Sequence, residues 1–207
     1  MAAAADADLG QQARALARAL VGLVVGEGRG RTLLRLYERR TGRVVLHGAP
    51  ELRRETIAAL EREALLLAAA YVEHTLPQRL GAQFARHERD EAAARFQEIF
   101  LSYLSGVLGW DRQERQRFLA DLSLYLHLGE RGPGARTGRA PACTEAFVQR
   151  CAFLLDASLM EQAQPVTVQF AREVIAHAEH ALRAVFGHRR TATARSARGR
   201  GSGWRRP

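Results

Sequence analysis

Residues 188–207 hold the densest group of side chains with a clear chemistry, which is the binding of anions. They contain seven arginines, one tryptophan and no acidic residue. A guanidinium group binds phosphate oxygens through paired N–H donors, and an indole ring offers a plane on which a base can stack. We therefore predict an anion-binding segment, with nucleic acid as its leading partner, made of Arg189, Arg190, Arg195, Arg198, Arg200, Trp204, Arg205 and Arg206.

The same segment is too polar to fold by itself. Its arginine, glycine and serine content leaves little apolar surface to bury, so we predict a disordered tail over residues 188–207. An anionic membrane surface or an acidic protein groove would attract the same charges. A solvated tail with no specific partner is a further alternative.

Most of the net positive charge lies in this tail. The formal net charge is +9, from 31 basic and 22 acidic residues. Seven of the basic residues belong to the tail, which leaves 24 beside the same 22 acids in residues 1–187. We therefore expect nucleic-acid binding to reside in an appendage. Every basic residue is arginine, and lysine and asparagine are absent, which a GC-rich genome explains more simply than selection against lysine.

Three tyrosines combine a polar hydroxyl with an apolar helical neighbourhood. Tyr71, Tyr103 and Tyr125 each stand in a stretch with apolar residues at helical spacing. They could line a cavity for a small molecule, which would make the protein a helical sensor. The alternative is that each is a core tyrosine with a local hydrogen-bond partner.

A histidine-containing group occurs near the end of the last expected helix. Glu173, His177 and His180 have the spacing i, i+4, i+7, so they share one side of a helix and could bind a metal ion. The apolar stripe with Phe170 and Val174 lies on the opposite side, so nothing shields the three from water. We predict a solvated Glu173–His177 pair, no metal site and no cofactor.

The chain has two cysteines, Cys143 and Cys151. On one helix they would lie about 12 Å apart along the axis, which is too far for a disulfide. Cys151 falls in an apolar stripe and is expected to be inert, whereas Cys143 begins the helix, where a thiolate is favoured, and is the more reactive candidate. Free cysteines suit a reducing compartment, so we expect a cytoplasmic protein.

The sequence motifs of common enzymes do not occur in the chain. We find no lysine-containing phosphate loop, no dinucleotide-binding glycine pattern between a strand and a helix, no serine elbow and no HExxH motif. No apolar run approaches the roughly 20 residues of a transmembrane helix. We therefore expect a non-enzymatic protein without a transmembrane segment.

Apolar residues recur at helical spacing along most of residues 1–187, which predicts a single all-α domain of six to seven helices. Pro50 suits the first position of a long helix, and Pro77 is expected to end it. That helix is apolar on so much of its surface that we expect it at the centre of the bundle. A short helix is expected over residues 78–86.

The second half of the chain contains further helix signals. A clear apolar stripe predicts a helix over residues 90–108. Asp111 and Glu114 have the spacing of a capping box for the next helix. Two more helices are expected, one from Thr144 and one over residues 165–186.

Residues 32–47 are the segment with a strand-like composition. Two stretches rich in β-branched, leucine and aromatic residues, 32–37 and 43–47, flank a polar link that contains Gly42. This arrangement predicts a small β-hairpin near the N-terminus, whose edge could join a partner in an assembly. Residues 129–142 are rich in glycine, proline and arginine and predict an exposed loop.

These observations favour a non-enzymatic regulatory or adaptor protein. Its helical body is expected to bind a protein partner or a second copy of itself, and its tail an anionic partner, with nucleic acid first. The alternatives are a helical small-molecule sensor and an assembly component that uses the hairpin edge.

Overall fold

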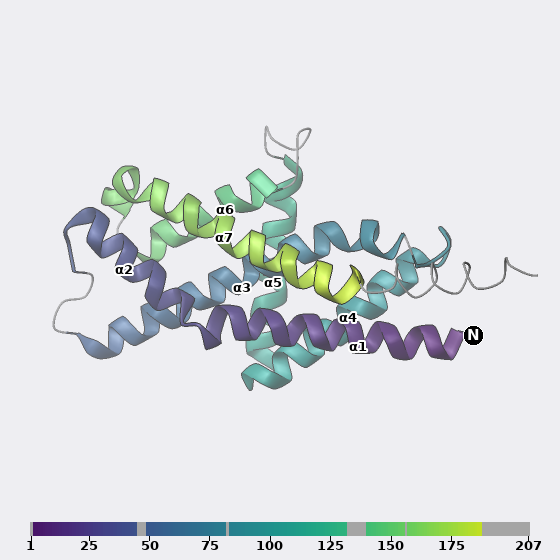
Figure 1. Cartoon of the computed structure of the whole chain (residues 1–207). Helices are drawn as coiled ribbons and strands as arrows, with labels where there is room; N and C mark the ends of the chain where they lie inside the picture. Colours follow the sequence, from purple (N-terminus) through teal and green to yellow (C-terminus); the bar gives the residue numbers. More distant parts are fainter. Residues whose placement is uncertain (1, 45–48, 82, 132–139, 156, 188–207) are drawn as a thin grey trace, which may run out of the picture.

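The computed structural model describes residues 2–44, 49–81, 83–131, 140–155 and 157–187. These residues are helical apart from turns and short links, and no strand occurs among them (Figure 1). The elements in chain order are α1 (Ala2–Val21), the π-helix η1 (Gly22–Gly26), α2 (Arg29–Thr41), α3 (Pro50–Leu80), α4 (Arg89–Leu108), α5 (Arg112–Arg131), α6 (Ala140–Leu154), the 3-10 helix η2 (Ala157–Leu159) and α7 (Met160–Phe186).

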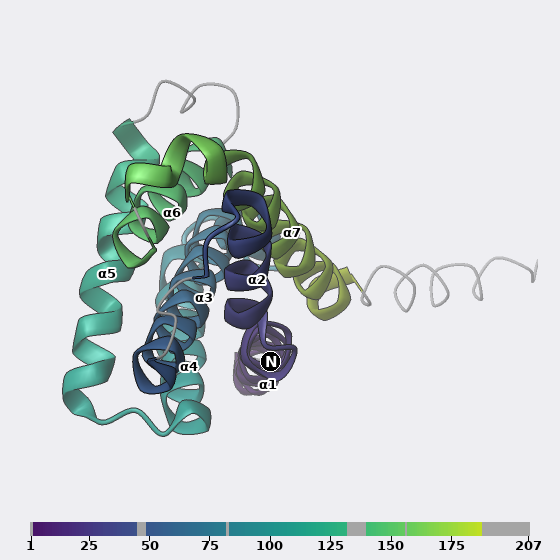
Figure 2. The same cartoon turned by 90° about the vertical axis from the view of Figure 1, so that its left-hand side faces the viewer.

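Helix α3 is the central element, as its apolar pattern predicts. Every residue from Glu63 to Ala70 is buried, so the helix has no solvent-facing side over this stretch. It packs against α2, α4, α5, α6 and α7. Figure 2 shows α3 between α5 and α6 on one side and α2 and α7 on the other. The buried apolar side chains of these helices form one continuous core.

The predicted start of α3 is confirmed, but its predicted end is wrong. Pro50 is the first helical residue, as predicted. The prediction that Pro77 ends the helix is wrong, and so is the short helix over 78–86, because α3 continues to Leu80. A proline removes only one backbone donor. Leu76 and Leu80 are buried and hold the last turns against the core.

The predicted hairpin is also wrong, because most of it lies in α2. Leu33, Leu34 and Tyr37 are fully buried and share one face of this helix. Gly42, which suggested a hairpin turn, has φ = 67° and caps the C-terminus, where its N–H donates to the carbonyl of Glu38. A glycine with positive φ occurs both at the C-terminus of helices and in hairpin turns, so Gly42 does not distinguish a helix from a hairpin. Residues 45–48 lie outside the described residues.

The link between α4 and α5 confirms the predicted helix boundaries. Gly109 follows α4 with φ = 67°. The backbone N–H of Asp111 donates to the carboxylate of Glu114 at 2.9 Å, and the N–H of Glu114 donates to Asp111 at 2.7 Å. This reciprocal pair is the predicted capping box.

The loop predicted over residues 129–142 is shorter at both ends. Helix α5 continues to Arg131, and α6 already begins at Ala140, ahead of the expected start at Thr144. The remaining residues of that loop lie outside the described residues. The last helix, α7, likewise begins at Met160, before the expected residue Pro165.

Within the described residues, no helix combines the length and the apolar character that a membrane-spanning helix needs.

Gly30 marks the closest approach of α2 to α3. A Cβ atom at this position would lie 2.3 Å from the carbonyl oxygen of Ile57 and 2.6 Å from Cγ of Glu61. The first contact is with backbone, which cannot rotate away. The missing side chain therefore sets the distance between the two helices.

We expect Gly30→Ala to lower the free energy of unfolding by about 1–3 kcal/mol, because α2 must move away from α3. Alanine by itself favours a helix over glycine by about 1 kcal/mol, so the sign of the change is informative. Gly106→Ala is the matched control, since a Cβ there meets nothing within 4 Å, and it should leave stability equal or higher. Urea denaturation measures both. A Gly30→Ala variant as stable as the wild type would contradict the close contact.

Candidate nucleic-acid interface

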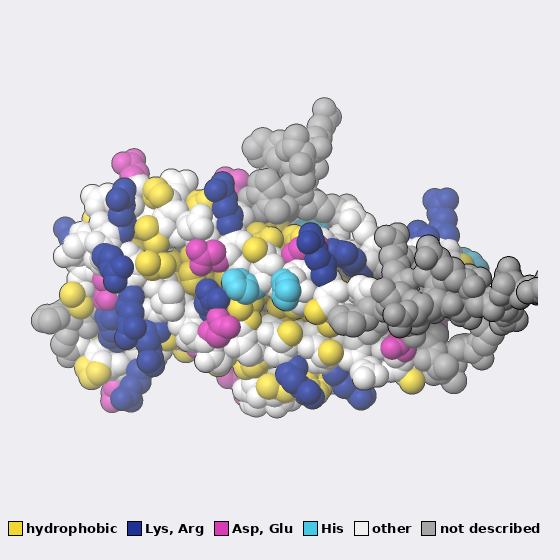
Figure 3. Space-filling model, viewed as in Figure 1, with side chains coloured by type: hydrophobic (Ala, Val, Ile, Leu, Met, Phe, Trp, Pro, Cys, Tyr) yellow, Lys and Arg dark blue, Asp and Glu magenta, His cyan; other side chains and the backbone are white. Residues whose placement is uncertain are grey.

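The outer face of α2 carries a row of arginines. Arg31, Arg35 and Arg39 are spaced four residues apart, so they follow one another along the helix, with steps of about 6 Å. All three are exposed, and they lie opposite the face that Leu33 and Leu34 bury. Arginine side chains gather over α2 and the start of α3 at the left of Figure 3. We call Arg31, Arg35 and Arg39 the α2 arginine row.

Nearby acids neutralise little of this row. Glu38 is the acidic residue of α2, and its carboxylate accepts hydrogen bonds from both terminal nitrogens of Arg53 on α3. Burial raises the pKa of Glu61 on α3, and the attraction of Arg31 offsets part of that rise. Arg35 and Arg39 form no ion pair with any carboxylate in the described part of the chain. The positive charge of the row is therefore available to a partner.

Other polar groups hold α2 in place, so the row is presented by a fixed helix. Arg40 donates from Nε to the carbonyl of Gln162 on α7 at 3.3 Å. Arg29 lies 2.7 Å from Glu27 and 3.8 Å from Glu173 of α7. These contacts place α2 antiparallel to the first half of α7. The contacts of Arg29 and Arg40 with α7 therefore help to hold the helix that carries the row.

The α2 arginine row was missed in the sequence because these residues were assigned to a hairpin. A hairpin places Arg35 in a strand and Arg39 in the turn, where they share no face. The available signal was the spacing of four residues, combined with Leu33, Leu34 and Tyr37 at i, i+1 and i+4. Both patterns belong to a helix.

The arginines and tryptophan predicted to bind nucleic acid between residues 188 and 207 lie outside the described residues. Gly187, the residue that precedes this segment in the chain, is described and caps the end of α7. Helix α7 begins beside α2 and ends at Phe186, toward the opposite end of the molecule (Figure 1). From Gln162 to Phe186 the helix rises about 36 Å. From Glu173, which lies beside the start of α2, the rise to Phe186 is about 20 Å, so the α2 arginine row and the end of α7 are about 20–36 Å apart along α7.

The three tyrosines have different partners on different helices. Tyr71 donates to Glu179 of α7 at 3.0 Å, and burial raises its pKa. Tyr103 accepts a hydrogen bond from Arg18 of α1 at 2.9 Å. Tyr125 is fully buried and donates to Glu63 of α3 at 2.9 Å. The structure does not bring the three together around one cavity.

Tyr125 belongs to a partly buried ionic network between α3, α5 and α6. Arg150 donates to both carboxylate oxygens of Glu63, at 2.7 and 2.8 Å. It also lies 3.1 Å from Asp121, which in turn pairs with Arg62 at 2.6 Å. Burial, with Glu63 beside it, raises the pKa of Tyr125 far above its usual value. Each charge has a partner, so the network stabilises the packing of three helices.

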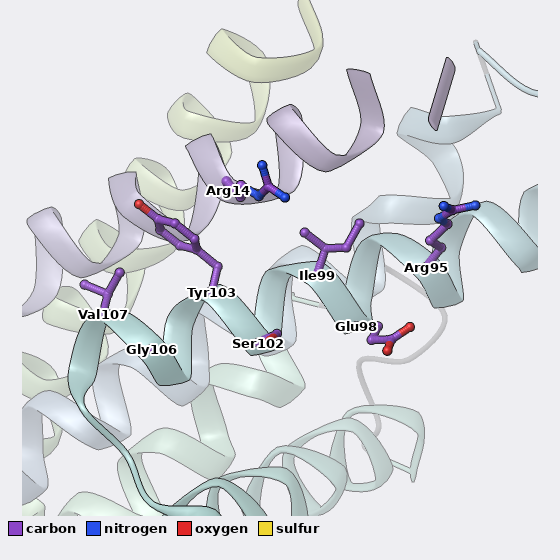
Figure 4. Close-up of a pocket in the computed structure, with 8 residues that line it drawn as sticks. All are labelled: Arg14, Arg95, Glu98, Ile99, Ser102, Tyr103, Gly106 and Val107. Carbon is purple, nitrogen blue, oxygen red and sulfur yellow. The ribbon is translucent and has the colours of Figure 1, made fainter. Parts of the chain in front are cut away.

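Tyr103 lines an open groove of about 670 Å³ between α1 and α4 (Figure 4). Ile99, Ser102 and Gly106 form one wall, and Arg14 contributes from α1. Neither Tyr71 nor Tyr125 is among its described lining residues. The binding of a protein partner by the helical body remains a prediction.

The histidine-containing group lies on α7, as the spacing predicts. His177 and His180 are exposed, and Nδ1 of His177 lies 2.7 Å from the carbonyl oxygen of Glu173. Glu173 is also within 3.8 Å of Arg29. Among the described residues, no three histidine, cysteine or acidic side chains are arranged to hold a metal ion.

Cys143, the cysteine expected to be the more reactive, is not exposed in the structure. Both cysteines lie on α6, both are buried, and neither forms a disulfide. Burial raises the pKa of Cys143 to about 11 and that of Cys151 well above its usual value. Because α6 begins at Ala140, Cys143 faces the core and not the solvent. A buried neutral thiol is a poor nucleophile.

Comparisons with known proteins find no match to this chain among family models, curated proteins or solved structures.

Glu73 of α3 is a partly buried residue whose carboxyl group has no charged partner among the described residues. Its Oε1 atom is buried and has no hydrogen-bond partner, while the side chain bonds to Gln97 of α4. Burial raises the pKa of Glu73 from 4.5 to about 7. The neutral form is therefore favoured in the folded state. The stability this provides is fully present below pH 4.5 and is lost as the pH rises through about 7.

We expect Glu73→Gln to remove that loss, because the amide stays neutral at every pH. At a pH above about 8 the variant should be more stable than the wild type by up to about 3 kcal/mol, and at about pH 4 the two should be similar. Urea denaturation across this pH range measures the difference. Glu91→Gln, which changes an exposed carboxyl of α4, is the matched control. Parallel profiles for Glu73→Gln and the wild type would refute the assignment.

Proposed function

We propose that this protein is a non-enzymatic regulatory or adaptor protein that binds nucleic acid. The observation that carries the proposal is the α2 arginine row, which exposes guanidinium groups with little acidic charge beside them. Such groups bind phosphate oxygens through charge-assisted hydrogen bonds. The arginines of residues 188–207 supply a second phosphate-binding element.

The two elements are expected to act independently. The start of α2 lies beside Glu173 of α7, so the α2 arginine row is separated from the end of α7 by about 20–36 Å of helix. Changes at distant sites without shared partners usually add in free energy. Each element can therefore be tested in the presence of the other.

We expect the combined change Arg31→Gln, Arg35→Gln and Arg39→Gln to weaken nucleic-acid binding and its salt dependence. Each lost phosphate contact makes the log–log salt slope less negative by about 0.9, so three contacts change it by about 2.7. Fluorescence anisotropy with a labelled DNA duplex at several salt concentrations measures the slope. The combined change Arg86→Gln, Arg112→Gln and Arg117→Gln removes the same charge at exposed sites on other segments and should leave the slope nearly unchanged.

We expect the substitution of the seven tail arginines by glutamine, in the full chain, to shift the same slope by about 6. Combining this change with the α2 substitutions should remove binding at low salt, because the two elements add. Circular dichroism provides the control for folding. The proposed function is wrong if the wild-type protein binds no oligonucleotide at low salt, or if neither set of substitutions alters the affinity.

A further inference from the structure

We infer that the α2 arginine row binds the sugar–phosphate backbone of duplex nucleic acid, independently of base sequence. This inference rests on the proposed function and specifies its partner. It follows from what α2 exposes, what it buries and how its neighbours limit its approach to a nucleic acid.

The α2 face lacks the groups that bind single strands. Proteins that bind single strands without sequence preference stack bases on exposed aromatic rings. The aromatic residue of α2 is Tyr37, which is fully buried. Phe153, which is 86% exposed, belongs to α6, whose packing partners are α3, α5 and α7. The bases of a single strand therefore have no exposed aromatic ring on α2 on which to stack.

The packing of α2 also limits how deeply the helix can enter a groove. The major groove is about 12 Å wide, which is close to the diameter of an α-helix with its side chains. A reading helix must therefore project from its domain. One face of α2 is packed against α3 and α7 along its length, from Arg29 beside Glu173 to Arg40 beside Gln162. With α3 and α7 packed on one face of α2 along its length, we expect the contacts of the row to be with the backbone.

The spacing of the row suits a regular array of phosphates. Guanidinium groups on a rigid helix advance by about 6 Å per step. Neighbouring phosphates of one duplex strand lie about 7 Å apart in space, because each step combines a rise of about 3.4 Å with a turn about the axis. A duplex holds that spacing without further ordering, whereas a flexible single strand must lose entropy to adopt it. A fixed row of charges therefore favours the duplex.

An anionic membrane is less well matched to this face. An amphipathic helix that binds a membrane inserts its apolar side between the lipids. The apolar residues Leu33, Leu34 and Tyr37 of α2 are fully buried in the protein core. The outer side of α2 offers charge with little apolar area to insert. Binding to a polyanion in water fits that composition better.

The test compares four probes with the full-length protein and its Arg31→Gln, Arg35→Gln, Arg39→Gln variant. The probes are two duplexes of unrelated sequence, about two helical turns long, a single strand with the same number of phosphates, and vesicles that contain phosphatidylserine. We expect the variant to lose affinity for both duplexes by the same factor, at least about tenfold at low salt. Its affinity for the single strand should change by less than about twofold, because the unchanged tail arginines bind that probe. The Arg86→Gln, Arg112→Gln, Arg117→Gln protein is the charge-matched control.

The outcomes separate this inference from the proposed function. Equal losses on the single strand and the duplexes would overturn the preference for a duplex, and a loss confined to one duplex sequence would overturn backbone recognition. A loss confined to the vesicles would replace the duplex by a membrane. In the first two cases the proposed function survives. Absence of nucleic-acid binding by the wild-type protein overturns both.

Discussion

The carboxylate of Glu63 is buried in the most crowded part of the molecule, and its neutralisation constrains the helices around it. A buried charge without a partner costs several kcal/mol, roughly the whole stability of a domain. Arg150 from α6 and Tyr125 from α5 provide the partners, and Asp121 and Arg62 extend the network to the surface. Two helices are thereby fixed in register on α3. The apolar surroundings strengthen these interactions by excluding water.

Helix α3 organises the other side of the molecule by a different contact. There the absence of a side chain at Gly30 lets α2 approach the backbone of Ile57. The apolar face of α2 is buried in this packing, Arg40 donates a hydrogen bond to Gln162, and Arg29 forms an ion pair with Glu173. What remains exposed is the α2 arginine row. A surface suited to phosphate thus arises as the outer side of a helix whose inner side is committed to the core.

Several local features of the fold are predictable from short stretches of sequence. The capping box of Asp111 and Glu114 and the terminal glycine Gly109 depend on residues only a few positions apart. The α2 helix shows the opposite case. Gly42 can close a hairpin or cap a helix, and the composition of residues 32–37 favours neither decisively. Packing of Leu33, Leu34 and Tyr37 against α3 and α7 selects the helix.

The sequence by itself determined the helical class, the central place of α3 and the segregation of charge into residues 188–207, because apolar periodicity and composition are properties of the chain alone. The tertiary structure decided which charged side chains form ion pairs with other helices and which remain exposed to solvent. Arg150 and Arg35 look alike in the sequence, yet one neutralises a buried carboxylate and the other faces solvent. Only the contacts between helices distant in the chain separate them, since the free energy of a charge depends on its surroundings.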